Sequence, residues 1–160
     1  MLETDTHYFF WRHQFGQWTL RDMRDPDGVI YNCCEQYMMA KKALLFGDIQ
    51  TYQRIMTSKS PSEQKDLGRM VTSFDAVLWE KHRFGIVWYA NYLKFSQHED
   101  LKIRLLNTGT RVIAEASPVD LVWGVGFAVE DEKIHDERNW TGLNLLGKAL
   151  MSVRESLKLL

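Results

Sequence analysis

Residues 31–48 read YNCCEQYMMAKKALLFGD, and this stretch decides our expectation for the fold. It is apolar nearly all round, which is typical of a helix that is buried on most sides. Asn32 is a good N-cap, and Glu35 follows it three residues later, as in a capping box. Gly47 can adopt the left-handed conformation that ends a helix. The stretch therefore predicts a buried helix with both ends marked.

Glu35, Lys41 and Lys42 are the charged side chains of this mostly apolar helix, and Lys41 points away from the other two. Glu35 and Lys42 are seven positions apart, which is about two turns at roughly 100° per residue, so they project from nearly the same face. The positions three and four residues from Lys42 are apolar: Met38, Met39, Leu45 and Phe46. Two interpretations stay open for each charge. Glu35 either closes the capping box or serves in catalysis, and Lys42 either reaches water along its apolar stem or serves in a site.

The rest of the chain predicts further helices and a few short strands. Helical patterns cover 49–56, 61–69, 76–94 and 99–107, and a long C-terminal helix begins near 140–144. Strands are expected on both sides of the turn at 26–28 and over 112–116 and 121–129, and 130–139 is expected to be a solvated loop. We therefore predict an α+β fold: one mostly helical domain over residues 1–160 with a small β-sheet.

Composition excludes several classes of protein. The formal net charge of -1 gives no basic field for non-specific binding to nucleic acid. No run of about 18 apolar residues exists, and 1–14 lacks the pattern of a secretory signal, so we expect a cytoplasmic protein that does not enter a membrane. The two cysteines, Cys33 and Cys34, are neighbours and are poorly placed for a disulfide, so we expect buried free thiols.

Common catalytic and cofactor motifs are missing. Five histidines show neither HExxH spacing nor a cluster with cysteine: His7, His13, His82, His98 and His135. There is no GxxxxGK[ST] loop and no GxSxG, so we expect no metal and no cofactor. What remains is a carboxylate and a lysine on one helical face, with tryptophans and glycines that could hold a base and a phosphate. That set suits cleavage at a sugar carbon.

Six blocks, in order over most of the chain, carry a resemblance to a known family. They are YNCCEQYMMAKKALLFGD, KDLGRMV, FDAVLW, YANYLKF, LLNTGTRVIAEASPVDLVWGVG and WTGLNLLGKALMSVR. In this combination the sequence resembles the YbiA-like family, also called the NADAR superfamily. The resemblance implies a YbiA-like fold and N-glycosidase chemistry, which is hydrolysis of the bond between a ribose carbon and a nitrogen.

The resemblance also implies roles for particular residues. Glu35 and Lys42 fall on the likely catalytic positions of the family. The candidate substrate-binding residues are Trp18, Arg69, Trp79, Trp123, Gly124, Gly126, Asp131 and Asn144. Each has a structural alternative, since tryptophans also fill cores and glycines in an extended segment also mark a bulge or a close backbone approach.

Elementary chemistry supports the catalytic assignment. Breaking a ribosyl C–N bond builds positive charge on the anomeric carbon, which a carboxylate such as Glu35 can stabilise while it activates water. Lys42 can attack the opened sugar as an amine, or stay charged and bind phosphate.

Family members act either on phosphorylated early intermediates of riboflavin biosynthesis or on ADP-ribosylated guanine in nucleic acid. The expected partner is therefore a small nucleotide-like substrate or ADP-ribosylated nucleic acid. The alternative is a non-catalytic module that binds ADP-ribose or a related nucleotide. The sequence does not indicate an oligomeric state.

Overall fold

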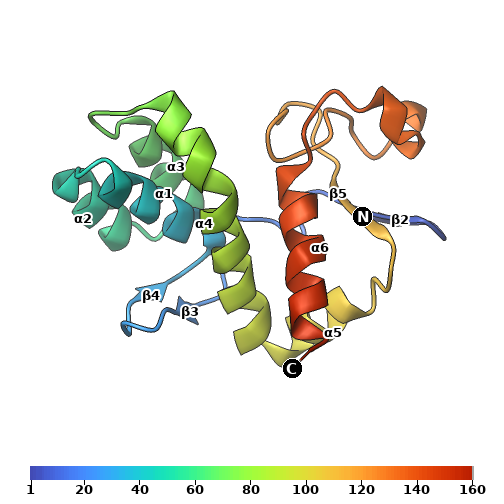
Figure 1. Cartoon of the computed structure of the whole chain (residues 1–160), viewed down its shortest axis with the longest axis horizontal. Helices are drawn as coiled ribbons and strands as arrows, with labels where there is room; N and C mark the ends of the chain where they lie inside the picture. The colour runs from blue at the N-terminus through green and yellow to red at the C-terminus, as the bar shows by residue number, and fades with distance from the viewer. Residues whose placement is uncertain (160) are drawn as a thin grey trace. The chain divides into compact units, whose positions relative to one another are not determined.

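The central helix expected from the sequence is α1, Cys34–Leu45, in a computed structural model that describes residues 1–159 (Figure 1). The chain forms two compact units, each with its own internal packing. Residues 17–97 form the helical unit, which contains α1. Residues 1–16 and 98–159 form the sheet unit.

The start of α1 differs from the prediction by one residue. The N-cap is Cys33, whose sulfur accepts a hydrogen bond from the Gln36 N–H at 3.4 Å. The Asn32 side chain is engaged elsewhere, since it donates to the Lys59 carbonyl and accepts from the Gln64 amide, each at 3.0 Å. Because Asn32 is held by these distant partners, the helix begins one residue later.

The end of α1 follows the prediction. Gly47 has a φ of 72°, and the Asp48 N–H donates to the Ala43 carbonyl at 2.9 Å. This is the left-handed helix ending that satisfies the last free carbonyls. α1 therefore has the buried body and the glycine stop that its sequence predicts.

Three helices pack on α1 in the helical unit (Figure 1). They are α2 (Ile49–Thr57), α3 (Pro61–Arg69) and α4 (Ala76–Gln97). A two-stranded hairpin, β3 (Met23–Arg24) with β4 (Ile30–Tyr31), precedes α1 and turns at Gly28, where φ is 86°. All four helices and the hairpin match the predicted positions to within a few residues.

The sheet unit contains a three-stranded sheet in the order β1-β2-β5. β1 (Leu2–Glu3) is antiparallel to β2 (His7–Phe10), which runs parallel to β5 (Val112–Glu115). Helix α6 (Leu145–Leu157) packs on β5 and also contacts α5 (Glu99–Leu106). The core of this unit includes Phe9, Ala114, Ala116, Val125 and Ile134.

Two sequence predictions in the sheet unit were wrong. The segment 121–129 forms no strand, because its carbonyls accept hydrogen bonds from the chain that follows: the N–H groups of Thr141 and Gly142 donate to Val125, and that of Asn144 donates to Gly124. The expected loop at 130–139 contains two short 3₁₀ helices, η1 (Glu132–His135) and η2 (Glu137–Asn139).

The predicted fold class, mostly helical α+β with small sheets, is confirmed. Among residues 1–159, no helix is long and apolar enough to cross a membrane. A single family domain over residues 1–160 stays a prediction.

Candidate active site

Helix α1 presents the two candidate catalytic groups. Glu35, in the first turn, is buried, and its main-chain N–H donates to the Gln17 carbonyl at 3.0 Å. Lys42, two turns further along, is half-buried. Burial lowers the pKa of Lys42, the Glu35 carboxylate raises it, and the charge of Arg69 lowers it, so that the pKa lies below the usual value. The Glu35 carboxylate therefore acts on the charge of Lys42, as expected for groups on one helical face.

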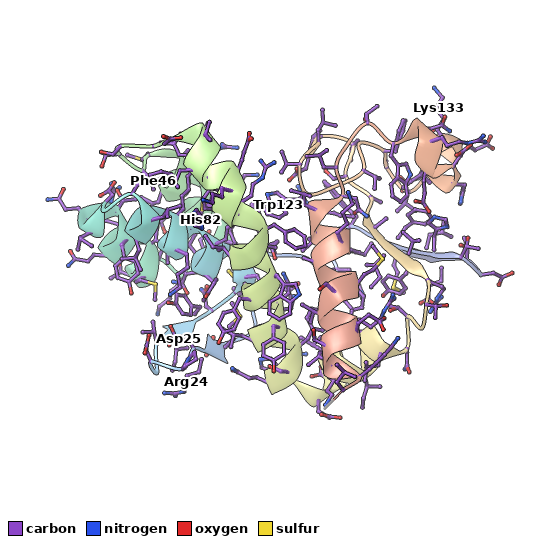
Figure 2. The ribbon with its side chains drawn as sticks, viewed as in Figure 1. Arg24, Asp25, Phe46, His82, Trp123 and Lys133 are labelled. Carbon is purple, nitrogen blue, oxygen red and sulfur yellow. The ribbon has the colours of Figure 1, made fainter. Side chains whose placement is uncertain are left out.

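Two aromatic rings flank the Lys42 ammonium. Its Nζ atom lies 4.7 Å from the centre of the Phe74 ring and 5.5 Å from that of Trp79. Phe46 lies at the end of α1 (Figure 2). Its ring packs edge-on against Phe74 with 5.4 Å between ring centres. A cation held against ring faces is stabilised electrostatically. The Lys42 ammonium is therefore packed against two aromatic rings, one from the link before α4 and one from α4 itself.

Phe74 was not among the residues singled out from the sequence. It lies in the link between α3 and α4 and is 48% exposed. The block FDAVLW contains both Phe74 and Trp79, but the pattern alone does not show that two rings five residues apart contact one lysine. Their shared contact with Lys42 depends on the course of the link before α4.

Arg69 and Trp18 also belong to the helical unit. Arg69 ends α3, its side chain is 69% exposed, and its guanidinium lies 3.6 Å from the Asp66 carboxylate. Trp18 is 41% exposed, and the Lys65 ammonium lies 5.8 Å from its ring centre. Arg69 therefore lies within electrostatic range of Lys42. Trp18 directly follows Gln17, whose carbonyl accepts the hydrogen bond from the Glu35 N–H.

The other predicted substrate-binding residues lie in the sheet unit. Asn144 precedes α6 with a φ of 51°, and its amide bridges two backbone groups of β5. Its Oδ1 accepts from the Glu115 N–H at 3.2 Å, and its Nδ2 donates to the Ile113 carbonyl at 2.9 Å. Asn144 therefore ties α6 to the sheet.

Gly124 and Gly126 lie where the backbone is crowded. A Cβ atom at Gly124 would lie 2.8 Å from the Ser117 Cβ. At Gly126, where φ is 86°, a Cβ atom would collide with the Thr141 hydroxyl. Close backbone approach thus accounts for both glycines in WGVGF within the unit itself.

The sheet unit also contains Trp123, which is labelled in Figure 2, and Asp131. Trp123 is half-buried, and its main-chain N–H donates to the Asp120 carboxylate at 2.8 Å. Asp131 is exposed and accepts a hydrogen bond from the Lys133 N–H at 3.0 Å, which caps η1. The Asp120 carboxylate thus caps a turn, and the Asp131 carboxylate caps the short helix η1.

The paired cysteines are free and buried, as predicted. Burial raises the pKa of the Cys33 thiol to about 12 and that of Cys34 to about 11. Neither thiol is an effective nucleophile near neutral pH, because the reactive form is the thiolate. Within residues 1–159, no group of three or more His, Cys, Asp or Glu side chains could hold a metal ion.

Comparisons with known proteins agree on one family. The model of the NADAR domain matches residues 3–158. N-glycosidase R617 of Acanthamoeba polyphaga mimivirus is 43% identical over 166 residues, which cover 96% of this chain and 98% of the viral protein. The riboflavin biosynthesis protein PYRR of Arabidopsis thaliana is 36% identical over 106 residues, which cover 64% of this chain and 16% of the plant protein. The NMR structure of the E. coli protein YbiA superimposes with a TM-score of 0.79 at 26% identity, covering 99% of this chain and 88% of YbiA.

Proposed function

Because this chain belongs to the NADAR family, we propose that it is an N-glycosidase, a hydrolase that cleaves the bond between a ribose carbon and a nitrogen. The mimiviral relative that carries this name aligns over almost its whole length. The substrate is a phosphorylated ribosyl or ADP-ribosyl compound. It is either an early intermediate of riboflavin biosynthesis, in keeping with the name of the plant relative, or ADP-ribosylated guanine in nucleic acid.

The observation that carries this proposal is the pairing of Glu35 and Lys42 on α1. A departing base leaves positive charge on the anomeric carbon of the ribose. A buried carboxylate such as Glu35 stabilises that charge and can activate the attacking water. One carboxylate is sufficient for both tasks, because the charge and the water lie at the same carbon.

Lys42 can serve this reaction in two ways. As a neutral amine it attacks the opened sugar at C1 and forms a Schiff base, and its lowered pKa favours that form. As a cation, with Arg69 in electrostatic range, it binds the substrate phosphate. Within the helical unit, the remaining residues of the proposed binding set are Trp18 and Trp79. For the sheet unit, binding roles stay predictions from the family resemblance; these residues are Trp123, Gly124, Gly126, Asp131 and Asn144.

Replacement of Glu35 by Gln tests the proposal. We expect kcat to fall by about 10³-fold or more, since a neutral amide cannot stabilise a cation or accept a proton, while substrate binding stays within a few-fold. Release of the free base is measured by chromatography on both substrate classes. Glu130→Gln, at an exposed position, makes the same chemical change as a control and should keep full activity.

Two outcomes would contradict this reading. Unchanged turnover in Glu35→Gln would remove Glu35 from the mechanism. If the unaltered protein bound ADP-ribose but hydrolysed neither substrate class, the protein would be a nucleotide-binding module.

A further inference from the structure

Gln17 is a buried glutamine that contacts the main chain of the candidate catalytic residue. Its side chain and backbone together are only 8% exposed. Its carbonyl accepts the Glu35 N–H at 3.0 Å, so the two residues are fixed side by side at the start of α1. The N-glycosidase role proposed above gives Gln17 no part.

Hydrogen bonds fix which way the Gln17 amide faces. The Nδ2 group of Asn91 donates to the Val87 carbonyl at 2.9 Å and to Oε1 of Gln17 at 3.0 Å. The Cys34 thiol in turn donates to Oδ1 of Asn91 at 3.7 Å. Turning either amide over would place two donors or two acceptors against each other. The oxygen of Gln17 therefore faces Asn91, and its nitrogen faces the other way.

The side-chain nitrogen of Gln17, which points away from Asn91, lacks an acceptor. Its Nε2 atom is buried and has no hydrogen-bond partner within residues 1–159. Folded proteins leave few buried donors unsatisfied, because such a donor loses its bonds to water and gains none in return. A donor held in a fixed direction, on the residue whose carbonyl binds the Glu35 main chain, is therefore suited to an acceptor that arrives with the substrate.

The charges of the helical unit indicate which part of the substrate lies near Gln17. Lys42 lies about two turns from Glu35, and Arg69 is within electrostatic range of Lys42, so the substrate phosphate belongs at that end of α1. With the anomeric carbon at Glu35, the base extends from the ribose on the side away from the phosphate. That direction leads to the start of α1, where Gln17 and the partly exposed ring of Trp18 lie.

We propose that the Gln17 amide donates a hydrogen bond to a carbonyl oxygen of the leaving base, an inference that rests on the N-glycosidase activity. As the C1–N bond breaks, its electron pair passes to the base nitrogen and is delocalised onto the ring carbonyl oxygen. The N–H of Gln17 stabilises this negative charge. Water supplies hydroxide to C1 of the ribose and a proton to the base nitrogen, which balances the reaction.

Two substitutions at Gln17 separate this role from a structural one. Gln17→Glu keeps an oxygen for Asn91 but removes the donor, whereas Gln17→Met removes both groups at similar volume. We expect both variants to lower kcat/KM by about 10- to 100-fold, mainly through kcat. Gln17→Met buries no new charge and should lower Tm less than Gln17→Glu, so the kcat of Gln17→Met is the decisive measurement. Gln53→Met, on the exposed side of α2, is the control and should match the unaltered protein.

A second substrate tests the identity of the acceptor. With a leaving base that lacks the ring carbonyl, such as 2-aminopurine in place of guanine, the unaltered protein should be slower and the Gln17→Met defect should shrink to about two-fold or less. An equal defect with both bases would place the contact on the ribose and overturn the proposal. Full activity in both Gln17 variants would also overturn it, while the N-glycosidase function would stand. If the unaltered protein hydrolysed neither substrate, the function itself would fail and this inference with it.

Discussion

At the scale of single residues, Lys42 decides between the two mechanisms, because a Schiff base needs its neutral amine and phosphate binding needs its charge. Burial and Arg69 lower the Lys42 pKa, and Glu35 raises it. If the amine attacks the sugar, borohydride added during turnover should trap an adduct. Trapping should increase with pH around a midpoint below the usual lysine value of about 10.4.

The same charges predict how Glu35→Gln shifts the pKa of Lys42. Glu35→Gln removes the group that raises the Lys42 pKa, so the neutral amine should appear at lower pH. This is measured as the pH dependence of Lys42 modification by an amine reagent. Lys41→Met is the control, because the Lys41 ammonium lies 5.2 Å from the Tyr37 ring instead. Absence of any adduct, with activity retained in Lys42→Met, would leave only the phosphate role.

The thiols of Cys33 and Cys34 should react slowly with alkylating reagents. Since burial raises the pKa of Cys33 to about 12 and of Cys34 to about 11, no more than about one thiol in a thousand is ionised at pH 8. Iodoacetamide should therefore modify the native protein far more slowly than the urea-unfolded protein, as followed by mass spectrometry. Rapid modification of the native protein would mean that the start of α1 opens readily.

At the scale of elements, Gly68 sets how closely α3 approaches α1. A Cβ atom at Gly68 would collide with the Met39 sulfur and lie 2.8 Å from the Met39 Cγ. Gly68→Ala should therefore lower the free energy of unfolding by about 1–3 kcal/mol, because Met39 must leave its packed position. The measurement is urea denaturation.

Gly85 in α4 provides the matched control for that change. A Cβ atom there would meet nothing within 4 Å. Gly85→Ala should raise the free energy of unfolding by up to about 1 kcal/mol, since alanine favours the helix and restricts the unfolded chain. If both alanine variants shifted stability in the same direction, close packing at Gly68 would not be the reason for its glycine.

Local signals were enough to predict some elements and not others. The turn at Gly28, the stop at Gly47 and the proline start of α3 are set by neighbouring residues, and the sequence predicts each of them. The first residue of α1 is different, because Asn32 is held by Lys59 and Gln64, which follow it by 27 and 32 positions. Such partners cannot be inferred from the eight or so residues that mark a helix start.

Whether a segment forms a strand also depends on residues far away along the chain. β2 lies beside β5 in parallel, with Phe9 opposite Ala114, more than a hundred positions away along the chain. The aromatic run at 7–10 therefore gave no clear signal on its own. Conversely, 121–129 has the composition of a strand, but its carbonyls are occupied by the chain leading into α6. Composition predicts an extended segment only where a partner strand is available.

At the scale of the whole molecule, some features of the candidate site follow from local sequence and others depend on residues far away along the chain. The face shared by Glu35 and Lys42 follows from helical spacing, so the sequence predicts it directly. The contact of Lys42 with Phe74 depends on the course of a link. Whether the buried Gln17 nitrogen meets an acceptor within residues 1–159 depends on which side chains surround it in the fold. Neither property is encoded in a local pattern. A family resemblance assigns positions, but only the contacts distinguish a side chain available to substrate from one such as Asn144 that holds two backbone groups.

The overall charge constrains how a nucleic-acid substrate could be bound. With 20 Lys and Arg against 21 Asp and Glu, the chain has no excess of positive charge to neutralise a phosphate backbone. If ADP-ribosylated nucleic acid is the substrate, binding must depend on the modification rather than on the strand. Unmodified single-stranded or duplex DNA should then neither bind detectably at physiological salt nor inhibit hydrolysis.

The salt dependence of kcat/KM measures how many phosphates of the substrate the protein contacts. A protein with six to ten phosphate contacts loses roughly 10³- to 10⁵-fold in affinity between about 50 and 200 mM salt, because condensed counterions are released on binding. Here kcat/KM for an ADP-ribosylated oligonucleotide should fall by less than about tenfold over that range, as expected for the one or two contacts that a diphosphate can make. A small phosphorylated ribosyl substrate, measured in parallel, should show a similar slope. A much steeper slope for the oligonucleotide would reveal contacts along its backbone, and would require a local basic surface despite the balanced total charge.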